Sequence, residues 1–281
     1  MPPNVLSHYQ VAPLLQARQQ GRAAATSSLD LGLSQVEVTL TADSVLFPGE
    51  IRLTWGQLEQ VARAENNCFL VGESSLDKIQ RFSEETNRLY TLFPTGGAPT
   101  MLISGIPMHR IKDTDPHRDT LAKVKTIAPL TGRVLDTATG LGYTAVAAAA
   151  TADAVITVEL DPTASEIARL NPWSQALFDH PKIERRIGDS YDEIETFADG
   201  TFSRIIHDPP MFNLAGDLYS LDFYRQAWRV LKRGGRMFHY IGDLESKSGR
   251  NVVRGVLNRL QQAGFTRVVR HPEAFGVVAY K

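Results

Sequence analysis

Three carboxylates stand at or just beyond the ends of expected strands, where a polar ligand could be bound. Asp136 and Glu159 each end such a strand, and Asp189 follows the third, Ile183–Ile187, by two residues. The carboxyl ends of parallel strands meet at one edge of a sheet, so we expect the three side chains to face one ligand. A carboxylate at the first position suits an ammonium group, the second suits two ribose hydroxyls, and the third suits the exocyclic amine of a purine.

A glycine turn follows the first of these runs. Residues 136–144 read Asp-Thr-Ala-Thr-Gly-Leu-Gly-Tyr-Thr and lead straight into the alanine-rich segment 145–150. Gly140 and Gly142 allow a tight turn and a close approach to a ligand, while the next helix offers unpaired amides and a positive dipole end. Asp136 would disfavour a pyrophosphate there, so we expect a cationic amino-acid ligand. The expected ligand-binding residues are Asp136, Thr137, Gly140, Gly142, Tyr143, Thr144, Glu159, Leu160, Asp189, Ser190 and Asp208.

A second chemical motif, Ile-Ile-His-Asp-Pro-Pro-Met-Phe, spans residues 205–212. Its two prolines fix the backbone and remove hydrogen-bond donors, so the Asp208 carboxylate and nearby carbonyls face a ligand as acceptors. Such a site suits a substrate N–H or O–H group, with Phe212 packing on the substrate. The candidate catalytic residues are therefore Asp208, Pro209, Pro210 and Phe212, and the alternative is a rigid turn after a strand. We expect His207 to be buried in the strand.

Short apolar runs alternate with amphipathic stretches after about residue 105, and this rhythm predicts βαβ units with a parallel sheet. The expected strands are Gly132–Asp136, Ala154–Glu159, Ile183–Ile187, Phe202–His207, Arg236–Ile241, Thr266–Arg270 and Phe275–Tyr280. The expected helices are Thr144–Thr151, Ala164–Ala176, Ser220–Leu231 and Val252–Gly264. Seven strands fit one sheet, which would position the carboxylates and the glycine turn at a common edge.

The first hundred residues have a different, strand-rich pattern. Strands are expected at Val36–Leu40, Cys68–Val71 and Leu89–Phe93, a helix at Trp55–Ala64, and a helical turn or two at Leu76–Phe82. A cluster that sustains neither regular structure, residues 95–99, is the predicted linker. We therefore expect a small β-rich accessory domain over residues 1–104 and a ligand-binding domain over residues 105–281.

Composition narrows the class of protein. The 281 residues are 43% hydrophobic and 22% charged, and no run approaches the roughly 20 apolar residues that span a bilayer. The first twenty residues lack the apolar core of a signal peptide, so we expect a cytoplasmic protein. A net charge of −1 lacks the footprint of a nucleic-acid binder, and the single cysteine excludes a multi-thiolate metal site. We expect neither a bound metal nor contact with a membrane. The expected acceptor is a small molecule, and the assembly that we consider is a homodimer.

These motifs together resemble the class I S-adenosylmethionine-dependent methyltransferases. The resemblance covers residues 105–281 and rests on Asp136 with Gly140 and Gly142, on Glu159, on Asp189, and on Asp208-Pro209-Pro210. It implies an α/β, Rossmann-like seven-stranded methyltransferase sheet with helices on both faces, preceded here by the β-rich N-terminal domain, and S-adenosyl-L-methionine as cofactor. Asp-Pro-Pro before an aromatic residue is similar to the motif of amino-group methyltransferases, which implies transfer to nitrogen, although Met211 lengthens the usual spacing.

Other segments resemble spermidine and spermine synthases, which also carry a small N-terminal β-rich domain and transfer aminopropyl from decarboxylated S-adenosylmethionine. These segments are residues 157–162, 218–224 and 231–235. The glycine turn is poorer in glycine and acid than theirs, and Asp208-Pro209-Pro210 replaces their acidic pair, so methyl transfer ranks first. The chain lacks the third glycine of the NAD-dependent dehydrogenase fingerprint, because Ala145 stands at that position. A non-catalytic nucleotide-binding protein would have no use for Asp208-Pro209-Pro210, so these residues argue against that alternative.

Overall fold

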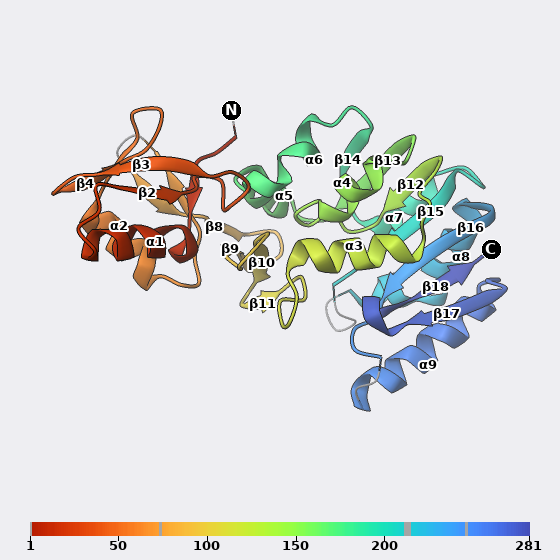
Figure 1. Ribbon diagram of the computed structural model, residues 1–281. Coiled ribbons are helices and arrows are strands. Elements are labelled where there is room, and N and C mark those ends of the chain that lie inside the picture. Colours follow the sequence, from red (N-terminus) through yellow and green to blue (C-terminus); the bar gives the residue numbers. More distant parts are fainter. Residues whose placement is uncertain (1, 73–74, 211–214, 245–246) are drawn as a thin grey trace. The chain divides into compact units, whose positions relative to one another are not determined.

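The computed structural model describes residues 2–72, 75–210, 215–244 and 247–281 (Figure 1). Contacts divide the chain into two compact units. One comprises Met1–His117 together with Thr163–Ala176, and the other comprises Arg118–Pro162 together with Leu177–Lys281. The domain boundary expected between residues 104 and 105 stays a prediction.

The second unit is built on a seven-stranded sheet with the order β14-β13-β12-β15-β16-β18-β17. The first five strands in this order are parallel, and β18 runs antiparallel to both of its neighbours. The strands are β12 (Arg133–Asp136), β13 (Ala154–Glu159), β14 (Ile183–Ile187), β15 (Phe202–His207), β16 (Leu231–Tyr240), β17 (Arg267–His271) and β18 (Gly276–Tyr280). The predicted Rossmann-like, seven-stranded α/β sheet is confirmed, and its strand order reverses at β12 and β15, where such sheets bind ligands.

Helices connect these strands and cover the sheet. They are α3 (Pro116–Thr126), α4 (Tyr143–Ala149), α6 (Gln175–Asp179), α7 (Ser190–Glu193), α8 (Leu221–Val230) and α9 (Lys247–Gln262), with 3-10 turns η2 (Ile194–Thr196), η3 (Gly216–Tyr219) and η4 (Pro272–Ala274). Neighbouring residues on an inner strand point to opposite faces, and both Val134 and Leu135 are buried. Leu135 belongs to the apolar cluster that α8 and α9 complete, while α4 packs on β12 and β13.

The first unit contains three small sheets and two helices that precede residue 117. Its strands are β1 (Val5–Leu6), β2 (Ala24–Ser27), β3 (Val36–Leu40), β4 (Ser44–Leu46), β5 (Arg52–Thr54), β6 (Phe69–Val71), β7 (Leu76–Lys78), β8 (Gln80–Ser83), β9 (Arg88–Phe93), β10 (Thr100–Ile103) and β11 (Ile106–Pro107). Its helices are α1 (His8–Gln19), α2 (Trp55–Arg63) and most of α5 (Pro162–Arg169), and η1 (Pro172–Ser174) follows. Both α1 and α2 begin with a capping box.

Two predictions for the first unit are wrong. Residues 76–82 form β7 and β8 instead of helical turns, because each strand pairs with an antiparallel neighbour whose hydrogen bonds outweigh local propensity. Residues 95–99 are not a linker. They form the loop between β9 and β10, which pair from Phe93 and Thr100 onward, so the glycine-rich cluster turns a hairpin.

The long helix expected at residues 164–176 is also wrong. The chain instead forms α5, η1 and α6, because Pro172 cannot donate to a continuing helix. Asn171 caps the new turn by accepting a hydrogen bond from the Trp173 amide at 3.1 Å. The Trp173 indole in turn donates to the Leu31 carbonyl at 3.2 Å, a contact within the first unit. Residues 163–176 thus belong to that unit although they lie between β13 and β14 in the sequence.

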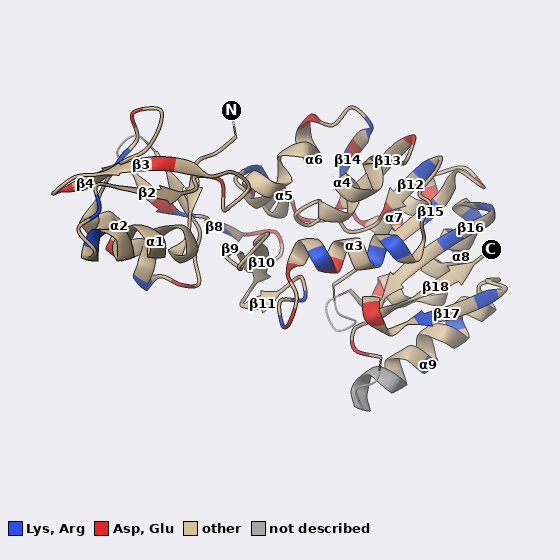
Figure 2. Cartoon of the chain, viewed as in Figure 1, with Lys and Arg blue, Asp and Glu red and all other residues tan. Residues whose placement is uncertain are grey.

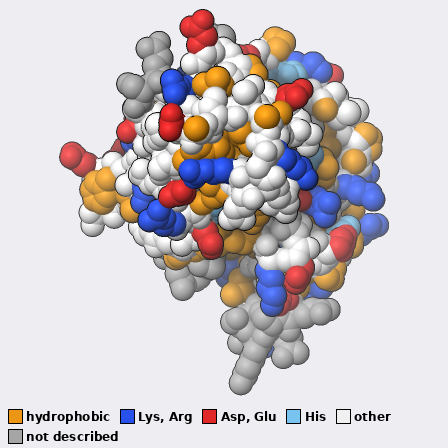
Figure 3. Space-filling model, turned by 60° about the vertical axis from the view of Figure 1, so that its left-hand side comes forward, with side chains coloured by type: hydrophobic (Ala, Val, Ile, Leu, Met, Phe, Trp, Pro, Cys, Tyr) orange, Lys and Arg blue, Asp and Glu red, His pale blue; other side chains and the backbone are white. Residues whose placement is uncertain are grey.

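Charge is distributed without strong separation. Acidic and basic residues both occur along α3 (Figure 2), and acidic, basic and apolar side chains are intermixed on the face that Figure 3 shows. This agrees with the net charge of −1. Within the described ranges, the helices are too short or too polar to cross a membrane.

Candidate functional site

The loop after β12 is fixed by hydrogen bonds to both neighbouring strands. The Thr137 amide donates to the Ile206 carbonyl of β15 at 3.0 Å, and the Thr139 amide donates to the Val158 carbonyl of β13 at 2.9 Å. The hydroxyls of Thr139 and Thr157 lie 2.6 Å apart. Backbone bonds therefore hold the loop in place at the carboxyl edge of the sheet.

Gly142 stands at the tightest point of this loop. Its φ is +77°, a left-handed conformation that favours glycine, and it forms the N-cap of α4 without a side-chain hydrogen bond. A Cβ there would lie 2.5 Å from the Leu177 side chain. The first backbone amides of α4 thus follow a position where only glycine fits. Nucleotide-binding turns use the same arrangement.

Asp136 is completely buried at the end of β12. Its Oδ2 accepts hydrogen bonds from the hydroxyls of Thr144 at 2.9 Å and Thr157 at 3.0 Å. Its Oδ1 is buried without a hydrogen-bond partner in the part of the chain that the structure describes. Burial raises the pKa of Asp136 to about 7, against the lowering effect of the two hydroxyls. The carboxyl group therefore ties α4 to β13.

Glu159 reaches back from the end of β13 to the same loop. Its Oε2 accepts from the Gly140 amide at 2.8 Å, and its Oε1 accepts from the Asp161 amide at 3.1 Å. Burial raises the pKa of Glu159, and these amides oppose that rise. A carboxylate offers about four acceptor positions, so two amides leave room for ribose hydroxyls.

Two large apolar side chains lie exposed beside Glu159. Leu160 is 53% exposed, and so is Ile187 at the end of β14, the residue opposite Glu159 in the strand register. An exposed apolar pair next to a carboxylate fits the faces of a purine. Asp189 and Ser190 follow: Asp189 caps α7 by accepting from the Tyr191 amide, and the buried Ser190 hydroxyl donates to the Thr137 carbonyl at 2.6 Å.

On the other side of β12, Asp208 follows β15 and makes an ion pair that the sequence did not predict. The Lys123 ammonium lies 2.6 Å from Asp208 Oδ2 and 2.8 Å from Asp119 Oδ2, so one lysine bridges two carboxylates. The side chains of Lys123 and Asp208 are 2% and 16% exposed. Burial raises the pKa of Asp208, Lys123 lowers it, and Asp119 raises it. Of Asp119, Lys123 and Asp208, only Asp208 is partly exposed to solvent.

The prolines after Asp208 shape the same corner. Pro209 is buried and Pro210 is exposed, and the Pro210 carbonyl accepts a hydrogen bond from the Tyr219 hydroxyl at 3.2 Å. Burial raises the pKa of Tyr219, and the negative charge of Asp208 adds to that rise, so the phenol stays protonated and can donate. Phe212, the remaining predicted catalytic residue, lies outside the described residues.

His207 is a buried structural residue, as the strand pattern predicts. Its Nε2 donates to the Leu218 carbonyl at 2.9 Å, so Nδ1 accepts from the Thr137 hydroxyl at 2.7 Å. Burial lowers the pKa of His207 to about 4, and the ring is neutral at physiological pH. The histidine thereby connects the glycine loop to the strand that carries Asp208.

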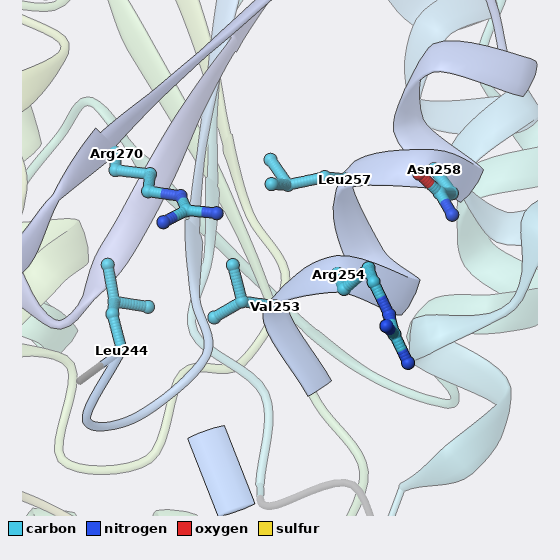
Figure 4. Close-up of a pocket in the computed structure, with 6 residues that line it drawn as sticks. All are labelled: Leu244, Val253, Arg254, Leu257, Asn258 and Arg270. Atoms are coloured by element: carbon cyan, nitrogen blue, oxygen red, sulfur yellow. The ribbon is translucent and has the colours of Figure 1, made fainter. Parts of the chain in front are cut away.

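A hollow of about 240 Å³ lies elsewhere in this unit, on α9 and β17 (Figure 4). Its lining residues are Leu244, Val253, Arg254, Leu257, Asn258 and Arg270. Arg270 extends toward Val253 and Leu257, whereas the Arg254 side chain points away from Arg270. The two guanidinium groups do not converge on one point, so they do not form an anion site in this hollow.

Two residues beside the predicted site had no clear signal in the sequence. Lys123 lies 85 positions before Asp208 on α3, a helix that no sequence pattern predicted. Its only local sign is Asp119, four residues earlier, a spacing that also occurs on solvated helix faces. Ile187 is an apolar residue at the end of an expected strand, and its exposure becomes apparent only in the folded sheet.

Comparison with known proteins identifies the family. Residues 114–267 match the family described as "Methyltransferase small domain". The uncharacterized protein MJ1233 of Methanocaldococcus jannaschii is 43% identical over 226 residues, which cover 80% of this chain and 77% of that protein. A polyamine aminopropyltransferase of Aeropyrum pernix is 28% identical over 127 residues, or 43% of this chain and 38% of that one.

The fold also has solved counterparts. A spermidine synthase structure in complex with the transition state analogue AdoDATO superposes with a TM-score of 0.59 at 19% identity, covering 72% of this chain and 71% of that chain. At this identity the likeness shows the fold alone.

Proposed function

Because this chain belongs to the methyltransferase small domain family, within the class I S-adenosylmethionine-dependent methyltransferases, we propose that it transfers a methyl group from S-adenosyl-L-methionine to a nitrogen of a small-molecule acceptor. One observation carries the proposal. The glycine loop and Asp208 follow adjacent parallel strands, β12 and β15, and Thr137 bonds directly to the end of β15. A donor held by the loop and an acceptor held at Asp208 would be neighbours.

The donor side has residues for each part of the cofactor. We assign the ribose hydroxyls to Glu159, the purine to the exposed Leu160 and Ile187 with Asp189 at its edge, and the amino group to the loop near Asp136. Thr137, Gly140, Gly142, Tyr143, Thr144 and Ser190 shape this side of the site. Bound S-adenosyl-L-methionine supplies an electrophilic sulfonium methyl group.

On the acceptor side, Asp208 accepts a hydrogen bond from an acceptor N–H and so orients the nitrogen lone pair. Pro209 and Pro210 fix the backbone that carries it, and Phe212 would pack on the acceptor. In this proposal the protein makes no covalent bond to the substrate. Its contribution is to align two bound molecules and to keep Asp208 ready as an acceptor of hydrogen bonds.

The test begins with the donor. Isothermal titration compares S-adenosylhomocysteine, S-adenosylmethionine, its decarboxylated form and NAD, and we expect the first two to bind most tightly. Labelled methyl transfer into cell extract, with and without nuclease treatment, then identifies the acceptor class. Transfer that survives nuclease and enters the small-molecule fraction supports the proposal, while preference for the decarboxylated donor contradicts it.

Aminopropyl transfer from decarboxylated S-adenosylmethionine is the second candidate, favoured by the sequence match to the polyamine aminopropyltransferase. Asp208-Pro209-Pro210 stands where spermidine and spermine synthases carry an acidic pair, and this difference is the reason to rank aminopropyl transfer second. Incubation with the decarboxylated donor and putrescine or spermidine, followed by detection of the longer polyamine, distinguishes the two reactions.

A further inference from the structure

We propose that Lys123, fixed by Asp119, is a positioning residue for the acceptor-side carboxylate of Asp208. This inference rests on the proposed function, because it assigns Asp208 its contact with the acceptor. Lys123 would hold Asp208 by one oxygen and leave the rest of the carboxylate facing the acceptor.

The geometry of the triad supports this assignment. Asp119 and Lys123 are four residues apart on α3, so they face the same side of the helix, and their charged atoms lie 2.8 Å apart. Both side chains are essentially buried. From there Lys123 reaches Asp208 Oδ2 at 2.6 Å, and Asp208 keeps 16% of its side-chain surface exposed. Of the two carboxylates that pair with Lys123, Asp208 is thus the one that a substrate can reach.

If Lys123 were only a structural residue, one carboxylate would be enough to pair its charge. A buried lysine requires a counter-charge, and Asp119 supplies one from the same helix. The ring of Tyr240, with its centroid 4.5 Å from the ammonium, stabilises the charge further. Asp208 is a second carboxylate, from another element, so the lysine fixes the direction of a side chain that would otherwise rotate at the end of β15.

The charges around Asp208 make the assignment measurable. Lys123 and Asp119 face it from α3, Tyr219 from η3, and the Asp136 carboxyl group interacts with it from the end of β12. The Lys123 charge and hydrogen bond lower the pKa of Asp208, while the Asp119 charge raises it. Removal of either group should therefore move the titration of Asp208, and the two removals should move it in opposite directions.

The experiment compares Lys123→Met with Asp119→Asn. Carbon-13 NMR of aspartate-labelled protein, with Asp208→Asn to assign the signal, follows the Asp208 carboxyl group during pH titration. We expect its pKa to rise in K123M and to fall in D119N. Lys182→Met is the matched control, because Lys182 is bonded to the carbonyls of Ala149 and Ala152 and should leave the Asp208 titration unchanged. If K123M does not fold, the direction of the shift in D119N decides alone.

A kinetic measurement completes the test. With the acceptor-containing fraction, K123M should lower kcat at least tenfold while S-adenosylhomocysteine binding stays within twofold, and the acidic limb of its pH profile should move to higher pH. Unchanged titration in both variants, or full kcat in K123M, overturns the proposal. The NMR titration needs no acceptor, so its result is independent of whether the protein transfers methyl groups.

Discussion

The two sides of the proposed site are held in place by different means. On the donor side, backbone bonds of the loop after β12 reach Ile206 and Val158 on the flanking strands, and Gly140 donates to the Glu159 carboxylate. On the acceptor side, the partly exposed carboxylate of Asp208 is paired with one buried lysine from α3. Backbone geometry therefore determines the first side, and a buried charge network determines the second. Substitutions on one side should therefore leave the other side intact. Four substitutions test this separation, in order of decreasing expected effect.

The largest effect is expected from Gly142→Val, which should disrupt the donor side. The new side chain would collide with Leu177 at a backbone φ of +77°. We expect S-adenosylhomocysteine affinity to fall at least about 100-fold, because overpacking and left-handed strain add at this position. Titration calorimetry measures the loss. Gly96→Ala, where a Cβ meets nothing within 4 Å, is the control, and equal losses in both variants would contradict the role of the turn.

Asp208→Ala should affect only the acceptor side. We expect turnover to fall about 100-fold, because a misaligned acceptor reacts slowly, while S-adenosylhomocysteine binding changes less than about twofold. Steady-state assays and calorimetry on one preparation separate the two effects. Asp222→Ala is the control, since Asp222 is largely exposed and pairs with Arg225 on α8. Unimpaired transfer in D208A would remove the acceptor-side assignment.

Asp136→Asn should change how the free energy of unfolding depends on pH. Burial raises the pKa of Asp136 to about 7, so the folded protein binds this proton more tightly than the unfolded chain does. The contribution of Asp136 to stability is therefore present at low pH and declines as pH rises from about 4 to about 7, by an amount on the order of a few kcal/mol. Urea unfolding at pH 5 and pH 8 should show a smaller decline in D136N. An equal decline in both proteins would mean that Asp136 is already ionised in the fold.

The smallest effect is expected from Ile187→Ala. The exposed side chain would lose its contact with the purine, and donor affinity should fall about 3- to 10-fold, as truncation of a partly covered apolar side chain predicts. Competition with a fluorescent adenosine analogue measures this change. Leu33→Ala, which removes a 50% exposed leucine from the first unit, should leave affinity unchanged. Similar losses in both variants would exclude a purine contact at Ile187.

Local patterns predicted the strands and the glycine turn of the proposed donor side, because strand ends and a glycine turn are local features of the sequence. β13, β14 and β15 have the predicted limits, and the turn before α4 forms at the predicted glycines. The acceptor side depends on Lys123, whose partner is 85 residues away, and no local pattern encodes that distance. Two other predictions were wrong. Residues 95–99 form a hairpin loop instead of a linker because β9 and β10 pair with each other, and the helix expected over residues 164–176 breaks because Pro172 has no amide proton to donate.

Thr137 has a consequence for the motion of the site. Its amide and its hydroxyl both contact β15, at Ile206 and His207, while Ser190 donates to its carbonyl. Breaking the loop away from the sheet therefore requires these bonds to open together. Amide protons at the end of β15 and in the loop should then exchange with solvent at a common rate, as one cooperative segment, so thermal fluctuation would leave the spacing of donor and acceptor nearly constant.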